Sequence, residues 1–427
     1  MQKKSKFRAF VTFIGLNFIF FACFLVGMSL VFGTFNSFFK KPLVSGSAPE
    51  ENFLVMPGDN LQKIAYNMYN EGLIKSPRSL LWLAILKGDK VKKQLERLQP
   101  GEYKVSANMS AVKILKILLD PNNVVKYSIT IIPGETVSDL IKKIGDSRLI
   151  SRDEFAIGTN DLVFLQTLGI FTKSLEGYLL PDTYIFTKPT SAKEIIARIV
   201  KEGKAKFGTD EFNQRLIKLN MSFDQVLTMA SIIEKETGVP EERPLVSSVL
   251  YNRLRLKMPL QSDPTVIYGV PDFKGVLTRE DLKRPTSYNT YINKGLPPTP
   301  ICNPSLESFK AALFPAETNY LYFVAKGDNS RSHVFSTTYA EHLKAVKEYR
   351  KSQALNEAIA EIEAEEKKKQ QRLDLKSYTA PQKKETKKAS SSSRSNRKVI
   401  SHIDPDLKDE APSLKDKRRD TLRSILD

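Results

Sequence analysis

One stretch near the middle of the chain predicts a helix with both ends marked: Ser222-Phe-Asp-Gln-Val-Leu-Thr-Met-Ala-Ser-Ile-Ile-Glu-Lys-Glu-Thr-Gly238. Ser222 followed by Gln225 is a capping-box start, and Gly238 followed by Pro240 is a stop signal. Apolar residues recur with helical spacing and form one stripe, which consists of Phe223, Val226, Leu227, Ala230, Ile233 and Thr237. Glu234 falls within this stripe, whereas Lys235 and Glu236 are expected to point elsewhere.

A carboxylate on the apolar face of a helix is a candidate proton donor. Burial disfavours the charged form, so such a group can hold its proton near neutral pH. A glycosidic general acid needs this property, and Glu234 is therefore the candidate catalytic residue. The alternative is a solvated Glu234 at the edge of the stripe, paired with a nearby Lys or Arg.

The sequence downstream supplies short polar groups in an apolar frame. Arg253 and Arg255 belong to a second predicted helix, and Leu260-Gln-Ser-Asp-Pro-Thr-Val-Ile-Tyr-Gly269 follows. Gln261 and Ser262 stand just before Asp263-Pro264, which predicts the start of another short helix. This combination suits a sugar cleft better than a metal site or a phosphate loop.

Several motifs in register resemble the YceG-like endolytic murein transglycosylases. They are Ala230-Ser-Ile-Ile-Glu-Lys-Glu-Thr237, Tyr251-Asn-Arg-Leu254, Leu260 to Gly269, Ser287-Tyr-Asn-Thr-Tyr291, Gly295-Leu-Pro-Pro298 and Leu321-Tyr-Phe-Val-Ala325. The resemblance extends from about Glu51 to Lys347, and in that family the first glutamate of the Glu-Lys-Glu triplet is taken as catalytic, which is Glu234. For holding the sugar we expect Gln261, Ser262, Tyr288 and Asn289.

A further motif of the same resemblance, Leu175-Glu-Gly-Tyr-Leu-Leu-Pro-Asp-Thr-Tyr184, joins the repeat region to the catalytic part. Glu176 and Asp182 are carboxylates among aromatic residues that could bind sugar hydroxyls. Their alternative role is to stabilise turns and the core.

The resemblance implies a reaction with a single acid. That acid protonates the oxygen between N-acetylmuramic acid and N-acetylglucosamine, and then takes the proton of the muramyl C6 hydroxyl to close a 1,6-anhydro ring. No protein nucleophile, metal or cofactor is expected, and the endolytic preference rests on the resemblance alone. The alternative is a non-catalytic, membrane-anchored protein that binds peptidoglycan or acts as a scaffold for peptidoglycan synthases.

The N-terminus predicts a membrane anchor. Lys3, Lys4, Lys6 and Arg8 precede the uncharged stretch from Ala9 to Phe39. This stretch is long enough to span a bilayer core of about 30 Å with some tilt. The positive flank favours a cytoplasmic N-terminus and a single pass through the inner (plasma) membrane, with the rest of the chain outside the cytoplasm. A cleaved signal peptide is the alternative, but its apolar region is normally about 7 to 15 residues long.

An internal repeat follows the linker. Met56-Pro-Gly-Asp-Asn-Leu61 recurs as Ile132-Pro-Gly-Glu-Thr-Val137, and Leu73-Ile74 recurs as Leu149-Ile150, always 76 residues later. Each copy predicts a strand, a Pro-Gly turn and an amphipathic helix. The pattern resembles LysM units, which are associated with N-acetylglucosamine polymers, although such units also occur as scaffold.

The net charge and the two cysteines bear on possible partners and sites. A net charge of +18 calls for an anionic neighbour, yet no nucleic-acid motif is present. Cys23 and Cys302 predict neither a disulfide framework nor a metal site.

We expect an α+β fold with a mixed sheet flanked by helices. The predicted parts are residues 1–8 in the cytoplasm, a transmembrane anchor at 9–39, a linker at 40–51, a LysM-like region at 52–155, the catalytic domain at 156–349, and a charged tail at 350–427. A helical run is expected to continue beyond Tyr349 before the tail becomes disordered.

Overall fold

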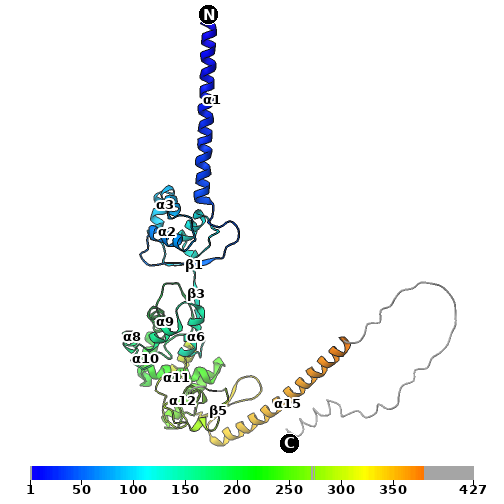
Figure 1. Ribbon diagram of the computed structural model, residues 1–427. Helices are drawn as coiled ribbons and strands as arrows, with labels where there is room; N and C mark the ends of the chain where they lie inside the picture. The colour runs from blue at the N-terminus through cyan, green and yellow to red at the C-terminus, as the bar shows by residue number, and fades with distance from the viewer. Residues whose placement is uncertain (1, 271–272, 274, 379–427) are drawn as a thin grey trace, which may run out of the picture. The chain divides into compact units, whose positions relative to one another are not determined.

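A computed structural model describes residues 2–270, 273 and 275–378 (Figure 1). The chain forms two compact units, of which the first contains Met1–Gln214 with Ile301–Leu306 and the second contains Arg215–Pro300 with the residues from Glu307 onward. The domain boundaries expected from the sequence remain predictions.

The first unit begins with an apolar helix. Helix α1 (Gln2–Phe35) continues into one π-helical turn, η1 (Asn36–Lys40). The segment Asn17–Lys40 has a mean hydropathy of 2.3, and its apolar window of 18 residues is not buried, so by length and composition it could cross a membrane. A signal sequence near an N-terminus has the same properties.

Both copies of the predicted repeat fold as a strand, a turn and a helix. Strand β1 (Glu51–Val55) leads to α2 (Leu61–Asn70), and β3 (Tyr127–Thr130) leads to α6 (Val137–Ser147). The turns are equivalent: Asp59 accepts a hydrogen bond from the Met56 amide and Glu135 accepts one from the Ile132 amide, both at 2.9 Å. Glycine is required in each turn, because φ is +82° at Gly58 and +85° at Gly134. The predicted elements of the repeat are confirmed.

Further helices complete the fold around the first copy. They are α3 (Pro77–Leu86), α4 (Asp89–Leu95) and α5 (Ala111–Leu119), and β2 (Gly101–Val105) pairs antiparallel with β1. The apolar core between them contains Phe53, Val55, Ile64, Met68, Leu80, Leu83, Tyr103, Ile114 and Leu118. Phe39 of η1 belongs to the same core, so the end of the apolar helix is packed onto this part of the chain.

The second copy lies among the remaining elements of the first unit. They are η2 (Pro121–Asn123), α7 (Arg152–Asn160), α8 (Leu162–Thr167), β4 (Thr183–Phe186), α9 (Ala192–Phe207) and α10 (Asp210–Leu219), which runs into the second unit. Strand β4 pairs antiparallel with β3.

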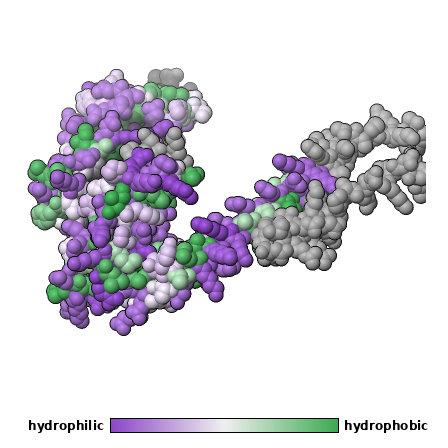
Figure 2. All heavy atoms as spheres, turned by 90° about the horizontal axis from the view of Figure 1, so that it is seen from below, coloured by the Kyte–Doolittle hydropathy of each residue, from purple (hydrophilic) through white to green (hydrophobic). Residues whose placement is uncertain are grey.

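The second unit is built around α11 (Phe223–Glu236). Its other elements are η3 (Pro240–Glu242), α12 (Arg243–Arg255), α13 (Asp263–Tyr268), η4 (Asp281–Lys283), α14 (Leu306–Leu313), β5 (Tyr322–Ala325), β6 (His333–Ser336) and α15 (Tyr339–Tyr378). The predicted hairpin of β5 and β6 is confirmed. The helical run expected beyond Tyr349 is confirmed as part of α15, which Figure 2 draws mostly hydrophilic as it leads to the grey trace. The rest of the predicted disordered tail lies outside the described residues.

The fold is α+β and mostly helical, but the predicted mixed sheet is wrong. The described strands form three separate two-stranded antiparallel sheets, β1 with β2, β3 with β4, and β5 with β6. Each strand has four or five residues. A mixed sheet contains parallel pairs, and parallel strands need a crossover connection. Here each sheet contains a single antiparallel pair, and no described strand joins one pair to another.

Candidate active site

Helix α11 is the scaffold of the candidate site. The Ser222 hydroxyl accepts from the Gln225 amide and the Gln225 side chain accepts from the Ser222 amide, which completes the predicted capping box. All eight residues from 226 to 233 are buried. The middle of the helix is therefore enclosed on every side, whereas the sequence indicated burial along one stripe. It packs against α12 and α13.

The last residue of α11 is a carboxylate in a poorly hydrated position. Glu236 accepts a short hydrogen bond from the Ser262 hydroxyl. Burial raises the pKa of Glu236 to about 7, and the charge of Asp263 acts in the same direction, while the Ser262 hydrogen bond and Arg253 oppose the increase. Such a carboxyl group is protonated over much of the neutral range and can donate that proton.

Arg253 of α12 holds the loop that carries Ser262. Its Nη1 donates to the Leu260 carbonyl at 2.8 Å and to the Gln261 Oε1 at 3.3 Å, and its Nε donates to the Leu321 carbonyl at 2.7 Å. Its guanidinium lies 5.2 Å from the centre of the Tyr322 ring. Arg253 therefore ties the loop to the strand region, and it places a positive charge near Glu236.

A second loop closes on the first. The amides of Gln261 and Ser262 donate to the carbonyl and the hydroxyl of Thr290, at 3.1 and 3.0 Å. The Tyr291 hydroxyl donates to Asp263 Oδ1 at 2.5 Å. The pKa of Tyr291 is raised, first by burial and then by the bond to Asp263. These bonds fix Ser262 beside the end of α11.

The structure brings four of the predicted sugar-binding residues onto these two loops, in different settings. The side chain of Gln261 is exposed, and its backbone has a left-handed φ of +52°. Ser262 is buried against Glu236. The Tyr288 hydroxyl bonds to Thr299 at 2.7 Å, and its ring packs edge-on against Tyr268.

Asn289 has an internal role. Its side chain is fully buried, and its Nδ2 donates to the carbonyls of Leu282 and Arg284 at 3.0 and 2.9 Å. Its Oδ1 accepts from the Tyr291 amide at 2.9 Å. These bonds shape the second loop, and a direct contact of Asn289 with sugar remains a prediction.

The predicted acid and the carboxylate beside Ser262 are different residues. Glu234 and Glu236 are both half-buried on α11, two positions apart. Two residues correspond to about 200° around a helix, so the two side chains leave α11 in nearly opposite directions. The bond from Ser262 identifies Glu236 as the one that faces the 260–263 loop. The catalytic role of Glu234 remains a prediction, and Glu236, which we expected to point elsewhere, is a second candidate.

The Glu242 carboxylate and the His333 imidazole hold the chain just after α11. Glu242 accepts hydrogen bonds from the His333 amide at 2.7 Å and from Thr237 Oγ1 at 3.2 Å, and it lies 2.6 Å from His333 Nδ1. Thr237 is the residue that follows α11. The β5–β6 hairpin is thereby fastened next to Glu236.

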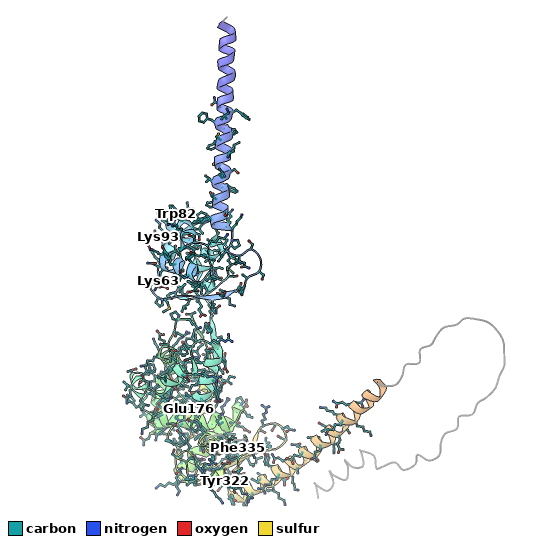
Figure 3. The ribbon with its side chains drawn as sticks, viewed as in Figure 1. Lys63, Trp82, Lys93, Glu176, Tyr322 and Phe335 are labelled. Carbon is teal, nitrogen blue, oxygen red and sulfur yellow. The ribbon has the colours of Figure 1, made fainter. Side chains whose placement is uncertain are left out.

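Glu176 lies in the first unit, where its carboxylate binds a backbone amide. It is 3% exposed, and both carboxylate oxygens accept from the Val137 amide, at 3.1 and 3.2 Å. A carboxylate at the first turn of α6 stabilises that helix through the unpaired amides of its N-terminus. Its neighbour Asp182 pairs with Lys206 on the surface at 2.7 Å. Sugar binding by Glu176 remains a prediction; its label is in Figure 3.

The arrangement at α11 offers one protonated carboxyl group, a nearby guanidinium and an exposed amide. No set of three or more His, Cys, Asp or Glu side chains within the described part of the chain could hold a metal ion. A carboxyl group with a pKa near 7 can donate a proton and take it back.

Comparisons with known proteins show the family of the chain. The model of the YceG-like family matches residues 53–348. The endolytic murein transglycosylase of Bacillus subtilis is 32% identical over 341 residues, covering 76% of this chain and 89% of that protein. The enzyme of the same name from Streptococcus pneumoniae serotype 2 is 27% identical over 298 residues, covering 63% of this chain and 53% of that protein. The crystal structure of a YceG-like protein from Listeria monocytogenes is 30% identical, with a TM-score of 0.48, and covers 70% of this chain and 99% of that one. The chain belongs to the YceG-like family.

Proposed function

We propose that this protein is an endolytic lytic transglycosylase of peptidoglycan. We propose Glu236 as its acid and base, with Glu234, the residue that the resemblance implies, as the alternative. The observation that carries the proposal is the position of Glu236, whose pKa of about 7 results from burial at the end of α11 beside the 260–263 loop. The relatives named as endolytic murein transglycosylases support the substrate class.

The proposed reaction needs only this acid. Protonated Glu236 gives its proton to the bridging oxygen as the bond from that oxygen to the muramyl C1 breaks. The substrate's own acetamido group stabilises the cationic carbon, so no protein nucleophile is required. The ionised Glu236 then takes the proton of the C6 hydroxyl as its oxygen bonds to C1. The product is a 1,6-anhydromuramyl end, no water enters, and Glu236 returns to its protonated state.

The surroundings of Glu236 match the two states that this cycle requires. Burial and the charge of Asp263 favour the protonated acid before cleavage. Arg253 and the Ser262 hydroxyl favour the carboxylate that exists after the proton has left. The opposing influences keep the pKa near neutrality, where a group serves well both as an acid and as a base. Gln261, whose side chain is exposed next to this position, is the proposed sugar contact.

The apolar helix α1 supports a membrane location for the proposed enzyme. We propose that the segment Asn17–Lys40 is a retained single-pass anchor, with the N-terminus in the cytoplasm and both units outside it. In this position the enzyme would meet newly made glycan strands and the synthases that make them. The LysM-like units of the first unit would bind the same glycan.

Digestion of purified peptidoglycan tests the proposed reaction. The expected products carry anhydromuramyl ends, detected by mass spectrometry, and arise within strands of defined length. Reducing ends, which are heavier by one water, would show a hydrolase and would overturn the proposal. Retained glycan binding without any cleavage would also overturn it, in favour of a non-catalytic peptidoglycan-binding protein.

A further inference from the structure

Helix α3 has an apolar surface on the side that does not face the core. Leu80 and Leu83 point into the core, while Trp82, Ile85 and Leu86 are 54%, 56% and 60% exposed. With 100° per residue, these three exposed side chains share one face of the helix. A helix that is apolar on all sides is normally buried on all sides. The exposed face of α3 therefore indicates a contact with another apolar surface that the described part of the chain does not supply.

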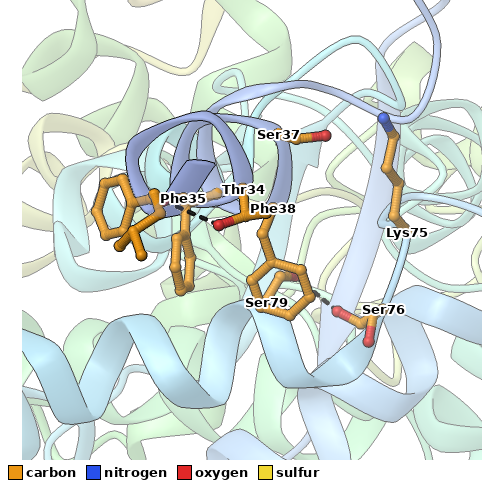
Figure 4. A pocket seen from close by; sticks show the side chains of 9 residues that line it. Thr34, Phe35, Ser37, Phe38, Lys75, Ser76 and Ser79 are labelled. Carbon is orange, nitrogen blue, oxygen red and sulfur yellow. Dashed lines mark hydrogen bonds between the residues drawn. The ribbon is translucent and has the colours of Figure 1, made fainter. Parts of the chain in front are cut away.

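The position of α3 relative to α1 indicates what covers this face. A pocket of about 570 Å³ is lined by Val31, Thr34 and Phe35 of α1 and, on the other side, by Lys75, Ser76 and Ser79 at the start of α3 (Figure 4). Contacts of α3 with the π-helical turn η1 fix the same arrangement. Figure 3 draws Trp82 at the end of this region from which α1 emerges.

The length of the anchor sets the depth of α3. The segment Asn17–Lys40 has 24 residues, which at about 1.5 Å per residue is longer than the bilayer core of about 30 Å. The segment ends at Lys40 and Lys41, whose charges favour the headgroup level, so the turn η1 and the last turn of α1 lie at that level. Because α3 starts beside these turns, its exposed face reaches the same level.

The residues of this face are those that favour a membrane interface. Tryptophan is enriched at the headgroup level, where its ring is in an apolar region and its N–H meets water. From Lys75 to Lys87 the chain carries Lys75, Arg78 and Lys87 and no Asp or Glu. All three basic side chains are exposed. Basic groups beside an inserted apolar face bind anionic lipid headgroups.

We propose that α3 is an interfacial membrane helix, which inserts Trp82, Ile85 and Leu86 into the outer leaflet next to the anchor and binds anionic headgroups through Lys75, Arg78 and Lys87. This inference rests on the proposed membrane anchor but not on the proposed reaction. It gives the first unit a second attachment to the membrane and fixes the orientation of the LysM-like part to the lipid surface.

Trp82 is the only tryptophan of the chain, so its fluorescence reports on this face alone. The full chain is placed in vesicles of phosphatidylethanolamine and phosphatidylglycerol, in which part of the lipid is brominated near the headgroup end of its acyl chains. We expect bromine to remove about half of the Trp82 emission, as for a helix lying about 5 to 10 Å into the interface. Aqueous iodide should have little effect.

A matched variant moves the single tryptophan within the same region. Trp82→Phe combined with Lys63→Trp places it on α2, where the Lys63 side chain is 62% exposed and lies farther from the α1 end in Figure 3. Its emission should be quenched by iodide and not by bromine. Glu236→Gln in the same vesicles should leave the Trp82 result unchanged, which separates this inference from the proposed reaction.

Two results would overturn the inference while the anchor stands. Quenching of Trp82 by iodide but not by bromine would place the face in water, and protection from both would place it against protein, such as a second copy of the chain. A chain that does not float with the vesicles would overturn the anchor and the inference together.

Discussion

Replacing Glu236 by glutamine should change how the stability of the protein depends on pH. The pKa of Glu236 rises from 4.5 to about 7 on folding, because burial disfavours the carboxylate. A carboxyl group with a raised pKa binds its proton more tightly in the folded state. Its contribution to stability is therefore complete below pH 4.5 and is lost as the pH rises to about 7.

The size of the effect follows from the shift. At about 1.4 kcal/mol per pH unit, the difference between 4.5 and about 7 corresponds to about 3 kcal/mol. Glutamine keeps the shape and can still accept from the Ser262 hydroxyl, but it never acquires the buried charge. Glu236→Gln should thus match the parent near pH 4 and exceed its stability by about 3 kcal/mol near pH 8.

Calorimetry of the soluble fragment 51–349 at a series of pH values measures this difference. At about 2 °C per kcal/mol, the unfolding temperature of the variant should exceed that of the parent by about 6 °C at the alkaline end. Lys235→Ala changes an exposed charge on the neighbouring residue and controls for general effects of charge. A difference between Glu236→Gln and the parent that stays constant across the pH range would refute the assignment of a buried, protonated Glu236.

Three further changes should act through single contacts. Ser262→Ala removes the hydroxyl that lowers the pKa of Glu236, so the alkaline limb of the pH–activity profile should move to higher pH; an unchanged limb would show that Ser262 does not act on the acid. Ser222→Ala removes the cap of α11 and should cost about 1 kcal/mol of unfolding free energy in a denaturant titration, whereas Ser222→Asp should restore it. Asn289→Ala leaves two partly buried carbonyls without their donor and should cost about 1 to 3 kcal/mol in the same titration. A loss of sugar affinity without a loss of stability would instead support the predicted sugar contact.

Local signals in the sequence located the elements of the structure well. The capping box at Ser222, the Pro-Gly turns of the two repeats and the turn between β5 and β6 each depend on residues close together in the chain, and each is present. The pairing of strands was not predictable in this way. It depends on contacts between distant segments, and short strands separated by helices carry no signal that distinguishes one mixed sheet from three pairs.

The choice between Glu234 and Glu236 shows a more specific limit of sequence reasoning, and the prediction of Glu234 as the acid stays a prediction. Glu234 follows the apolar residues Leu227 and Ala230 by seven and four positions, which placed it on the stripe. Glu236 follows Met229 and Ile232 by the same intervals, and both of these are fully buried. Since the middle of α11 is enclosed on every side, periodicity could not decide between the two carboxylates. The hydrogen bond from Ser262 separates them, and it joins residues 26 positions apart.

Some of the predicted sugar-binding residues have structural roles, which the sequence offered as an alternative for Glu176 but did not show for Asn289. Polar side chains in loops hold backbone groups as often as they meet ligands, and only the fold shows which carbonyls and amides need a partner. Asn289 and Glu176 are buried against backbone groups of their own units, whereas Gln261, which precedes Ser262 in the chain, is exposed. The arginine that holds the 260–263 loop, Arg253, was recognised as part of a helix but not as part of the site.

The most direct test of the account compares Glu236→Gln with Glu234→Gln on the same purified peptidoglycan, with anhydromuramyl ends counted over time by mass spectrometry. Removal of a general acid lowers a rate by about 10²-fold or more, so Glu236→Gln should form these ends at least about a hundredfold more slowly than the parent. Glu234→Gln should stay within about tenfold of the parent, as expected for a residue that does not transfer the proton. Full activity of Glu236→Gln together with loss of activity in Glu234→Gln would contradict the account and return the catalytic role to Glu234.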